Sequence, residues 1–196
     1  MSRYLLVPLL ALLAAPALAA PPLTPADRAR LDGLDEAVGR ALRQVLTLPG
    51  DDADRKAALS ALSGPVVGVD PASLAGDWSC RTVKMGRTSP AVAYPPFACR
   101  IAVEGGVVTL EKRTGSQRLR GTVDARDGQQ VFVGVGYIAG DNPPGYEALP
   151  PGDGAASDPQ RVPVVGLLEM TGPDRGRLLM PSPVLESDLD LLEISR

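Results

Sequence analysis

Histidine does not occur anywhere in the 196-residue chain. It is the usual proton-transfer side chain near neutral pH and the commonest transition-metal ligand in proteins. Its absence excludes Ser-His-Asp and Cys-His catalytic arrangements, and every metal site that needs an imidazole. From the sequence we assign no catalytic residue, no metal site and no cofactor.

The chain has few aromatic residues, and its net charge is negative. Phe, Trp and Tyr together make up 4% of the chain, and Trp78 is its only tryptophan. The 20 basic side chains are outnumbered by 23 acidic ones, which leaves a formal net charge of −3. Because binding to nucleic acid depends on clustered positive charge, we expect no nucleic-acid partner.

The longest apolar run lies close to the N-terminus. Arg3 precedes an apolar stretch from Leu5 to Leu18 that contains two prolines and overlaps a small-x-small triplet at 17–19. This order is typical of a secretory signal peptide, and the run is shorter than the roughly 18 residues of a membrane-spanning helix. We expect residues 1–19 to be cleaved, the mature protein to be periplasmic or secreted, and no stable membrane anchor to remain. An uncleaved anchor is the alternative.

The chain has two cysteines, Cys80 and Cys99. In an oxidising compartment they have one intramolecular pairing available, so we expect a disulfide between them. Closing a loop of about 20 residues stabilises a fold by roughly 3 kcal/mol on the chain-entropy model. The spacing is not that of a C-x-x-C redox pair.

Residues 20–69 carry the signals of a helical segment. Thr24 precedes a proline and an acid, as at a helix start, and leucine and valine then recur every three or four residues. This pattern predicts one helix from Thr24 to about Leu48. Asp51 or Asp52 then caps a second, shorter helix, before a linker at 63–71. Asp70, with Pro71 after it, caps a last helical turn.

From Trp78 onward the sequence is typical of an antiparallel sheet, because short β-branched runs alternate with glycine, proline, asparagine and aspartate. We predict an α+β fold in which the helical segment precedes a roughly eight-stranded antiparallel β-barrel over residues 70–196. A two-sheet sandwich is the alternative. The predicted strands lie near residues 78–85, 97–103, 107–113, 118–124, 130–138, 162–170, 176–180 and 189–195.

One hairpin can be placed in register. If Gly115-Ser116 forms a two-residue turn, with positive φ at the glycine, Arg113 faces Arg118 and Glu111 faces Arg120. We expect the first pair to be repulsive and the second to be an ion pair on the solvent side.

The other face of this hairpin is apolar and is predicted to point inward. Lys112 has the same parity near the hairpin tip, so we expect its stem to lie inside and its ammonium group to reach water. The strand at 130–138 has apolar residues on both parities, which indicates a central strand packed on both faces. The inward residues are Val108, Leu110, Leu119 and Val123.

Residues 139–161 contain several prolines and few apolar groups, which predicts one long irregular loop. Asp141, Asp153 and Asp158 lie in it, and carboxylates of this kind bind calcium outside the cell. Their spacing matches no EF-hand, so we favour solvated turn residues.

Four arginines are candidates for binding an anion. Arg81, Arg113, Arg118 and Arg120 are candidates for binding an anionic group or a partner, because planar guanidinium groups bind carboxylate and phosphate through two hydrogen bonds. A solvated charged face is the alternative, and we favour it.

Carboxylates cluster near the C-terminus, at Glu186, Asp188, Asp190 and Glu193. Hydrolysis of sugars requires a pair of such groups. Strand alternation puts Asp188 and Asp190 on one face, which we expect to point outward, and we do not assign catalysis to them.

Gly76-Asp77-Trp78 resembles the G-x-W signature of the calycin barrels, the lipocalin and avidin group. In that group the tryptophan plugs one end of the barrel, and a basic residue after the last strand lies against it. The resemblance implies that Trp78 and Arg196 form such a plug through a cation–π contact. A core tryptophan with a frayed terminal arginine is the alternative.

A second resemblance covers most of residues 70–196. The segments Gly76–Thr82, Glu111–Arg118 and Glu186–Glu193 are similar to recurrent segments of a bacterial exported family catalogued as domain of unknown function 4893. The resemblance implies export, an N-terminal helical part and a β-rich C-terminal part. It implies no catalytic residues.

These observations favour an exported, non-enzymatic binding or interaction protein. The barrel core or the rim of the long loop would meet a small apolar ligand, an envelope component or another protein. A carboxylate-dependent hydrolase and a structural envelope protein are the alternatives.

Overall fold

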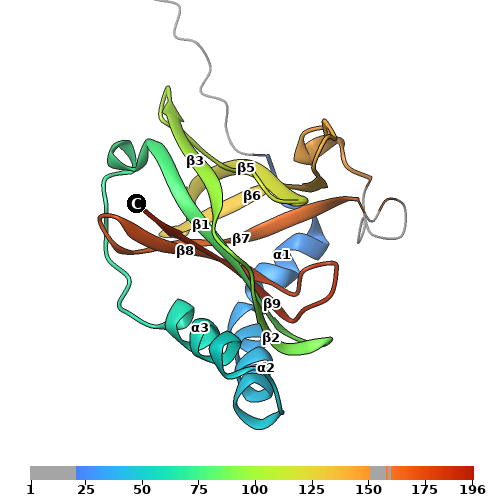
Figure 1. Ribbon diagram of the computed structural model, residues 1–196. Helices are drawn as coiled ribbons and strands as arrows, with labels where there is room; N and C mark the ends of the chain where they lie inside the picture. Colours follow the sequence, from blue (N-terminus) through green and yellow to red (C-terminus); the bar gives the residue numbers. More distant parts are fainter. Residues whose placement is uncertain (1–20, 151–157, 159) are drawn as a thin grey trace, which may run out of the picture.

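The computed structural model describes residues 21–150, 158 and 160–196 (Figure 1). The predicted signal peptide at 1–19, and Asp153 of the long loop, lie outside the described residues. Helices come first in the chain and strands follow, as the α+β prediction requires.

The helical elements are α1 (Pro25–Asp32), α2 (Leu34–Thr47), α3 (Asp52–Leu62) and the short 3-10 helices η1 (Pro71–Leu74) and η2 (Tyr146–Ala148). The strands are β1 (Gly76–Gly86), β2 (Ser89–Ala93), β3 (Phe97–Glu104), β4 (Val107–Lys112), β5 (Gln117–Arg126), β6 (Gln129–Ile138), β7 (Arg161–Gly172), β8 (Arg175–Pro181) and β9 (Leu189–Ser195). No helix in this described part is long and apolar enough to cross a membrane.

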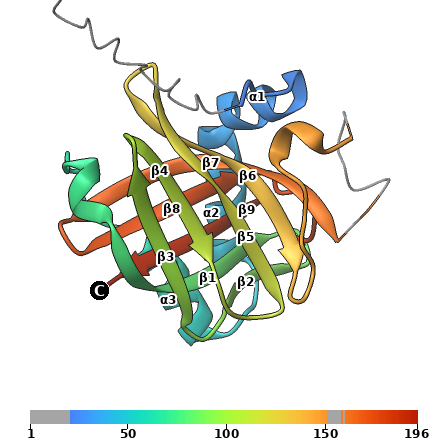
Figure 2. The same cartoon turned by 90° about the horizontal axis from the view of Figure 1, so that it is seen from above.

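Eight strands form a closed antiparallel barrel (Figures 1 and 2). From β3 to β9, strands that follow one another in the chain are paired. β1 pairs with β3 on one side and with β9 on the other, which closes the ring. The predicted barrel is confirmed, and the sandwich alternative is wrong.

The short strand β2 was not predicted. It pairs only with the second half of β1, for instance Val83 with Ala93, and lies outside the closed ring. Pro90 lacks a backbone donor, and proline in a strand is confined to edges of this kind.

The predicted single helix over 24–48 is wrong, because the chain breaks at Gly33 into α1 and α2. Gly33 caps α1 by donating to the carbonyl of Ala29. α1 then packs on β7 and β8, whereas α2 packs on β1, β2, β8 and β9, so the axis has to change direction. Glycine, the weakest helix former after proline, allows that change.

Two other helix starts agree with the sequence. The Asp51 carboxylate accepts from the amides of Ala53 and Asp54 at the start of α3, and the Asp70 carboxylate accepts from Ala72 at the start of η1. Unpaired amides at helix N-termini favour such caps.

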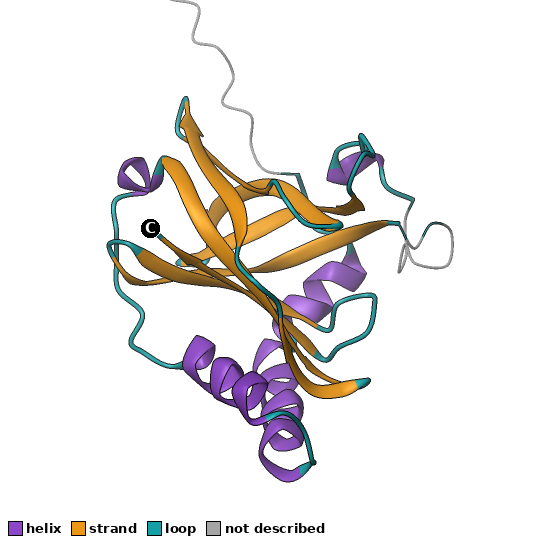
Figure 3. Ribbon diagram, in the orientation of Figure 1, coloured by secondary structure: helices purple, strands orange, loops and turns teal. Residues whose placement is uncertain are grey.

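Figure 3 shows the helices along the outside of the strand ring. Val83, Met85 and Leu191 on the outer face of the barrel pack against buried alanines and Val45 of α2 and α3. The outer side chains of β6 are buried as well, while its Phe132 lies inside the barrel. The prediction that this strand is packed on both faces is confirmed.

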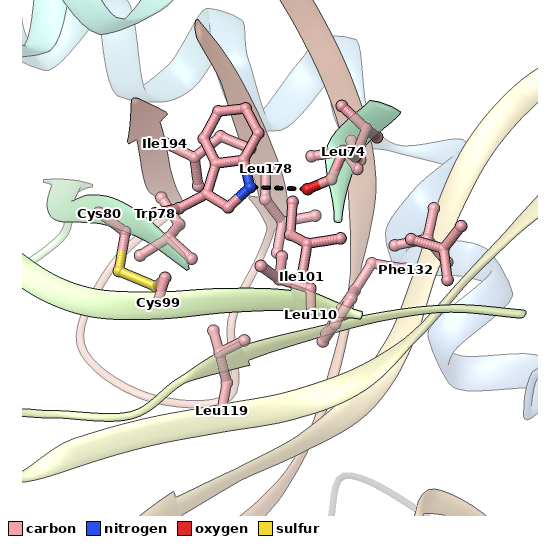
Figure 4. Packing of buried hydrophobic residues seen from close by; sticks show 14 of the residues in the cluster. Leu74, Trp78, Cys80, Cys99, Ile101, Leu110, Leu119, Phe132, Leu178 and Ile194 are labelled. Atoms are coloured by element: carbon pink, nitrogen blue, oxygen red, sulfur yellow. Dashed lines mark hydrogen bonds between the residues drawn. A yellow bond between two sulfur atoms is a disulfide. The ribbon is translucent and has the colours of Figure 1, made fainter. Parts of the chain in front are cut away.

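At one end of the barrel interior, apolar side chains cluster around Trp78 (Figure 4). The Trp78 indole donates to the carbonyl of Leu74 at 2.8 Å, and the Cys80–Cys99 disulfide joins β1 to β3 beside it, with the two Cα atoms 5.8 Å apart. The expected disulfide is therefore present. Around these residues pack Ile101, Leu110, Phe132, Leu178, Leu192 and Ile194.

Arg196 lies over this end of the barrel. Its guanidinium carbon is 4.4 Å from the centroid of the Trp78 ring. The guanidinium also donates to the Ser73 carbonyl and to Asp174, both at 2.9 Å. These bonds hold the terminal arginine in place rather than leaving it frayed.

We predict that Arg196→Ala lowers the free energy of unfolding by about 1 kcal/mol and shifts the fluorescence of Trp78, because it removes the cation from the ring. Urea titration followed by that fluorescence measures both effects. Arg175→Ala, which changes an exposed arginine of β8, is the matched control. Unchanged stability and unchanged fluorescence in Arg196→Ala would restore the frayed-terminus alternative.

Candidate ligand-binding site

The end of the barrel away from Trp78 is not filled. It holds an open cavity of about 150 Å³, which we call the barrel mouth. Most of its wall is apolar, contributed by inward side chains of five strands, β3 and β5 to β8, and by the β8–β9 loop. These wall residues include Phe97, Leu119, Ile138, Val162, Val164, Met180 and Leu185.

Lys84 projects into the mouth from β1. Its ammonium group donates to the Glu186 carboxylate at 2.5 Å and to the side-chain oxygen of Gln117 at 3.0 Å. Burial by itself would lower the pKa of Lys84, but the Glu186 bond and the charges of Asp190 and Glu186 together raise it above its ordinary value. Lys84 is therefore a compensated cation.

Asp190 enters the mouth from β9 and accepts a hydrogen bond from the Ser187 hydroxyl at 2.5 Å. Burial raises the pKa of Asp190 to about 6, although the Ser187 bond and the charge of Lys84 act in the opposite direction. The carboxyl group therefore titrates close to neutral pH.

The expected outward direction of Asp190, on one face with Asp188, is wrong. Asp188 precedes β9 and lies outside the barrel, where it accepts from Gln44 of α2 at 2.6 Å. Strand alternation begins only at Leu189, after a turn in which Glu186 has a φ of 67°. Asp188 lies before the strand, so the alternation of β9 does not place it on the same face as Asp190.

Lys112 also stays inside, with 5% of its surface exposed, so the expectation that its ammonium group reaches water is wrong. The ammonium group donates to the Gln117 carbonyl and lies 3.9 Å from the centroid of the Phe97 ring. Burial, and then the charges of Arg118 and Lys84, lower the pKa of Lys112 to about 8.

The register predicted for the β4–β5 hairpin is confirmed, with Glu111 opposite Arg120 and a φ of 89° at Gly115. The ladder ends at the Lys112–Leu119 pair, one step before the expected Arg113–Arg118 contact. The expected ion pair of Arg120 is replaced, since its guanidinium donates to the Pro143 carbonyl and lies 5.8 Å from the Tyr137 ring centroid.

The structure separates the four candidate arginines. Arg118 lines the mouth and donates through its Nε to the Gly115 carbonyl at 3.2 Å. Arg81 pairs with Glu193 at 2.6 Å on the outer face of the barrel, and Arg113 lies 3.9 Å from Asp77. The four side chains therefore do not make one anion site, and Arg118 is joined at the mouth by two lysines.

Two acids of the long loop, Asp141 and Asp158, approach the guanidinium group of Arg161. Asp141 pairs with Arg161 at 2.6 Å, and this hydrogen bond lowers the pKa of Asp141. Asp158 lies 3.8 Å from the same guanidinium. Within the described ranges, no three acidic or cysteine side chains gather as a metal site would require.

Asp190 makes the stability of the fold depend on pH. Its folded pKa of about 6 lies above the ordinary 3.8, so its favourable contribution is fully present below about pH 3.8 and is lost as the pH rises through 6. A shift of this size corresponds to about 3 kcal/mol.

We predict that Asp190→Asn, which mimics the protonated carboxyl, matches the wild type near pH 4 and exceeds its free energy of unfolding by up to about 3 kcal/mol near pH 7. Urea titrations across this range measure the difference. Asp188→Asn, outside the barrel, is the matched control. A wild-type-to-variant difference that stays constant with pH would contradict the assignment.

Comparison with known proteins identifies the family of the chain. A search of curated proteins finds no match to the chain. The family described as Domain of unknown function (DUF4893) matches over residues 22–194, a range that covers α1 to α3, β1 to β8 and all of β9 except its last residue. The chain, with its helical segment packed on a closed barrel, belongs to this DUF4893 family.

Proposed function

We propose that this protein is an exported, non-enzymatic binding protein that holds a small, largely apolar molecule in its barrel mouth. The observation that carries the proposal is the lining of the barrel mouth. A cavity of about 150 Å³ lies open there, and most of its wall is made of apolar side chains. Small barrels are readily filled by their own side chains, and unfilled space reduces stability.

The size of the cavity limits the ligand. An apolar cavity of about 150 Å³ takes up a molecule of roughly the size of benzene. The apolar part of the ligand is therefore one ring or a short chain, with the remainder projecting through the open side of the mouth. Two charged groups, Lys112 and Arg118, line the same cavity.

Two features of the chain support export. The N-terminal sequence has the order of a signal peptide. The Cys80–Cys99 disulfide persists in an oxidising compartment such as the periplasm.

A carboxylate-dependent hydrolase is the second candidate, because the pKa of Asp190 is raised in the manner of a general acid and Glu186 lies close by. Both carboxylates are already committed, Glu186 to Lys84 and Asp190 to Ser187. We therefore prefer binding without catalysis.

The proposal is tested by titrating the folded protein with toluene, indole and hexanol while recording amide chemical shifts. We expect saturable shifts at residues of the mouth with dissociation constants below about 1 mM. Val164→Phe, which fills the cavity, should abolish them. Val66→Phe, on the exposed linker, should leave them unchanged.

Two results would contradict the proposal. One is the absence of saturable shifts with all three compounds. The other is a Val164→Phe variant that binds as the wild type does.

A further inference from the structure

The charges at the barrel mouth do not balance. Four cations line it. Arg30 pairs with Asp27 at 2.8 Å and donates to the Pro163 and Pro181 carbonyls. The other three are Lys84, Lys112 and Arg118, and among the described residues only two carboxylates, Glu186 and Asp190, approach this group.

The two carboxylates serve Lys84. Glu186 bonds to its ammonium group, and Asp190 raises its pKa by proximity. In the part of the chain that the structure describes, the charges that act on Lys112 are both positive, those of Arg118 and Lys84. The positive charge that no carboxylate compensates is therefore that of Lys112 and Arg118.

Hydrogen-bond donors remain available at the same place. The Lys112 ammonium group has three donors and gives one to the Gln117 carbonyl, while Arg118 uses its Nε on the Gly115 carbonyl. The terminal amino groups of the guanidinium make no hydrogen bond to the described residues. An ammonium and a guanidinium group that line one cavity, and whose charges act on each other, together suit the oxygens of one carboxylate.

The choice of lysine at these positions is informative. The chain has three lysines, Lys56, Lys84 and Lys112, against 17 arginines, and two of the three lie in the mouth. A buried cation with cationic neighbours destabilises a fold, and its lowered pKa reflects that cost. A bound anion would remove it.

From this we propose that the ligand of the barrel mouth is a small carboxylate, whose ring or short chain occupies the cavity and whose carboxylate group binds Lys112 and Arg118. The inference rests on the proposed function. A monoanion fits best, because the net excess is one positive charge and a dianion would be repelled by Glu186 and Asp190.

The test compares 3-phenylpropionate with its uncharged analogue 3-phenylpropanamide by calorimetry at neutral pH. We expect the acid to bind at least about tenfold more tightly than the amide, as one charge-assisted contact provides. Lys112→Met should remove this preference while leaving the protein folded and no less stable, because it deletes an uncompensated buried charge. Arg118→Gln should reduce the preference several-fold.

Two variants serve as matched controls. Lys56→Met changes the lysine outside the mouth, and Arg113→Gln changes the arginine of the same hairpin that lies near Asp77. Both should retain the full preference for the acid.

The pH dependence provides a second readout. The affinity for 3-phenylpropionate should rise as the pH falls through about 8, where Lys112 gains its proton, and again through about 6, where Asp190 loses its charge. Lys84, Arg118, Glu186 and Arg30 also face these groups. The amide should bind with little dependence on pH.

The outcomes separate this inference from the proposed function. Equal affinity for acid and amide, or a Lys112→Met variant that keeps the preference, would overturn the inference and leave apolar binding intact. Failure of toluene as well as both phenylpropyl compounds to bind would overturn both.

Discussion

The ladder between β1 and β9 is the interaction on which the rest of the molecule depends. Residues Ser79–Met85 of β1 pair with Leu189–Ser195, and this pairing joins the first strand of the ring to the last. An open sheet would leave two unpaired edges and would expose the even-numbered side chains of β1. Closure turns those side chains inward, so Trp78, Cys80 and Lys84 share one interior although their chemistry differs.

That interior is divided along the barrel axis. Around Trp78 it is packed with apolar side chains and strengthened by the disulfide and by Arg196, which lies over the indole ring. At the mouth the same inward parity carries Lys84, Lys112 and Asp190, whose pKa values are all displaced. The apolar packing and the disulfide at one end stabilise the fold, whereas the burial of charged groups at the other end is unfavourable. The helices pack on the outer face of the ring.

Local patterns predicted most of the fold. Eight strands, the helix starts at Asp51 and Asp70, the hairpin register and the disulfide all follow from turn chemistry, capping and residue spacing, which act over a few residues. The errors occur where a distant element changes the outcome. Gly33 breaks a helix because its two halves pack on different strands, and the edge strand β2 depends on β1 to pair with it. The predicted outward direction of Asp190 is wrong because both faces of β9 carry apolar residues, so alternation alone does not show which face is inside. Leu189 and Leu191 pack under the helices, and Leu192 and Ile194 lie inside the barrel.

The amino-acid sequence by itself determined the order of helices and strands, the covalent bond between its two cysteines, and the absence of histidine-based chemistry. Those properties depend on composition and on neighbours along the chain. Only the tertiary structure decided which charged side chains meet. In the folded chain Lys84, Lys112, Arg118 and Asp190 line one opening of the barrel. Arg81, Arg113 and Asp188 lie outside this opening and contact Glu193, Asp77 and Gln44. Strand tilt and closure bring together residues more than 100 positions apart, and no local pattern encodes such a meeting.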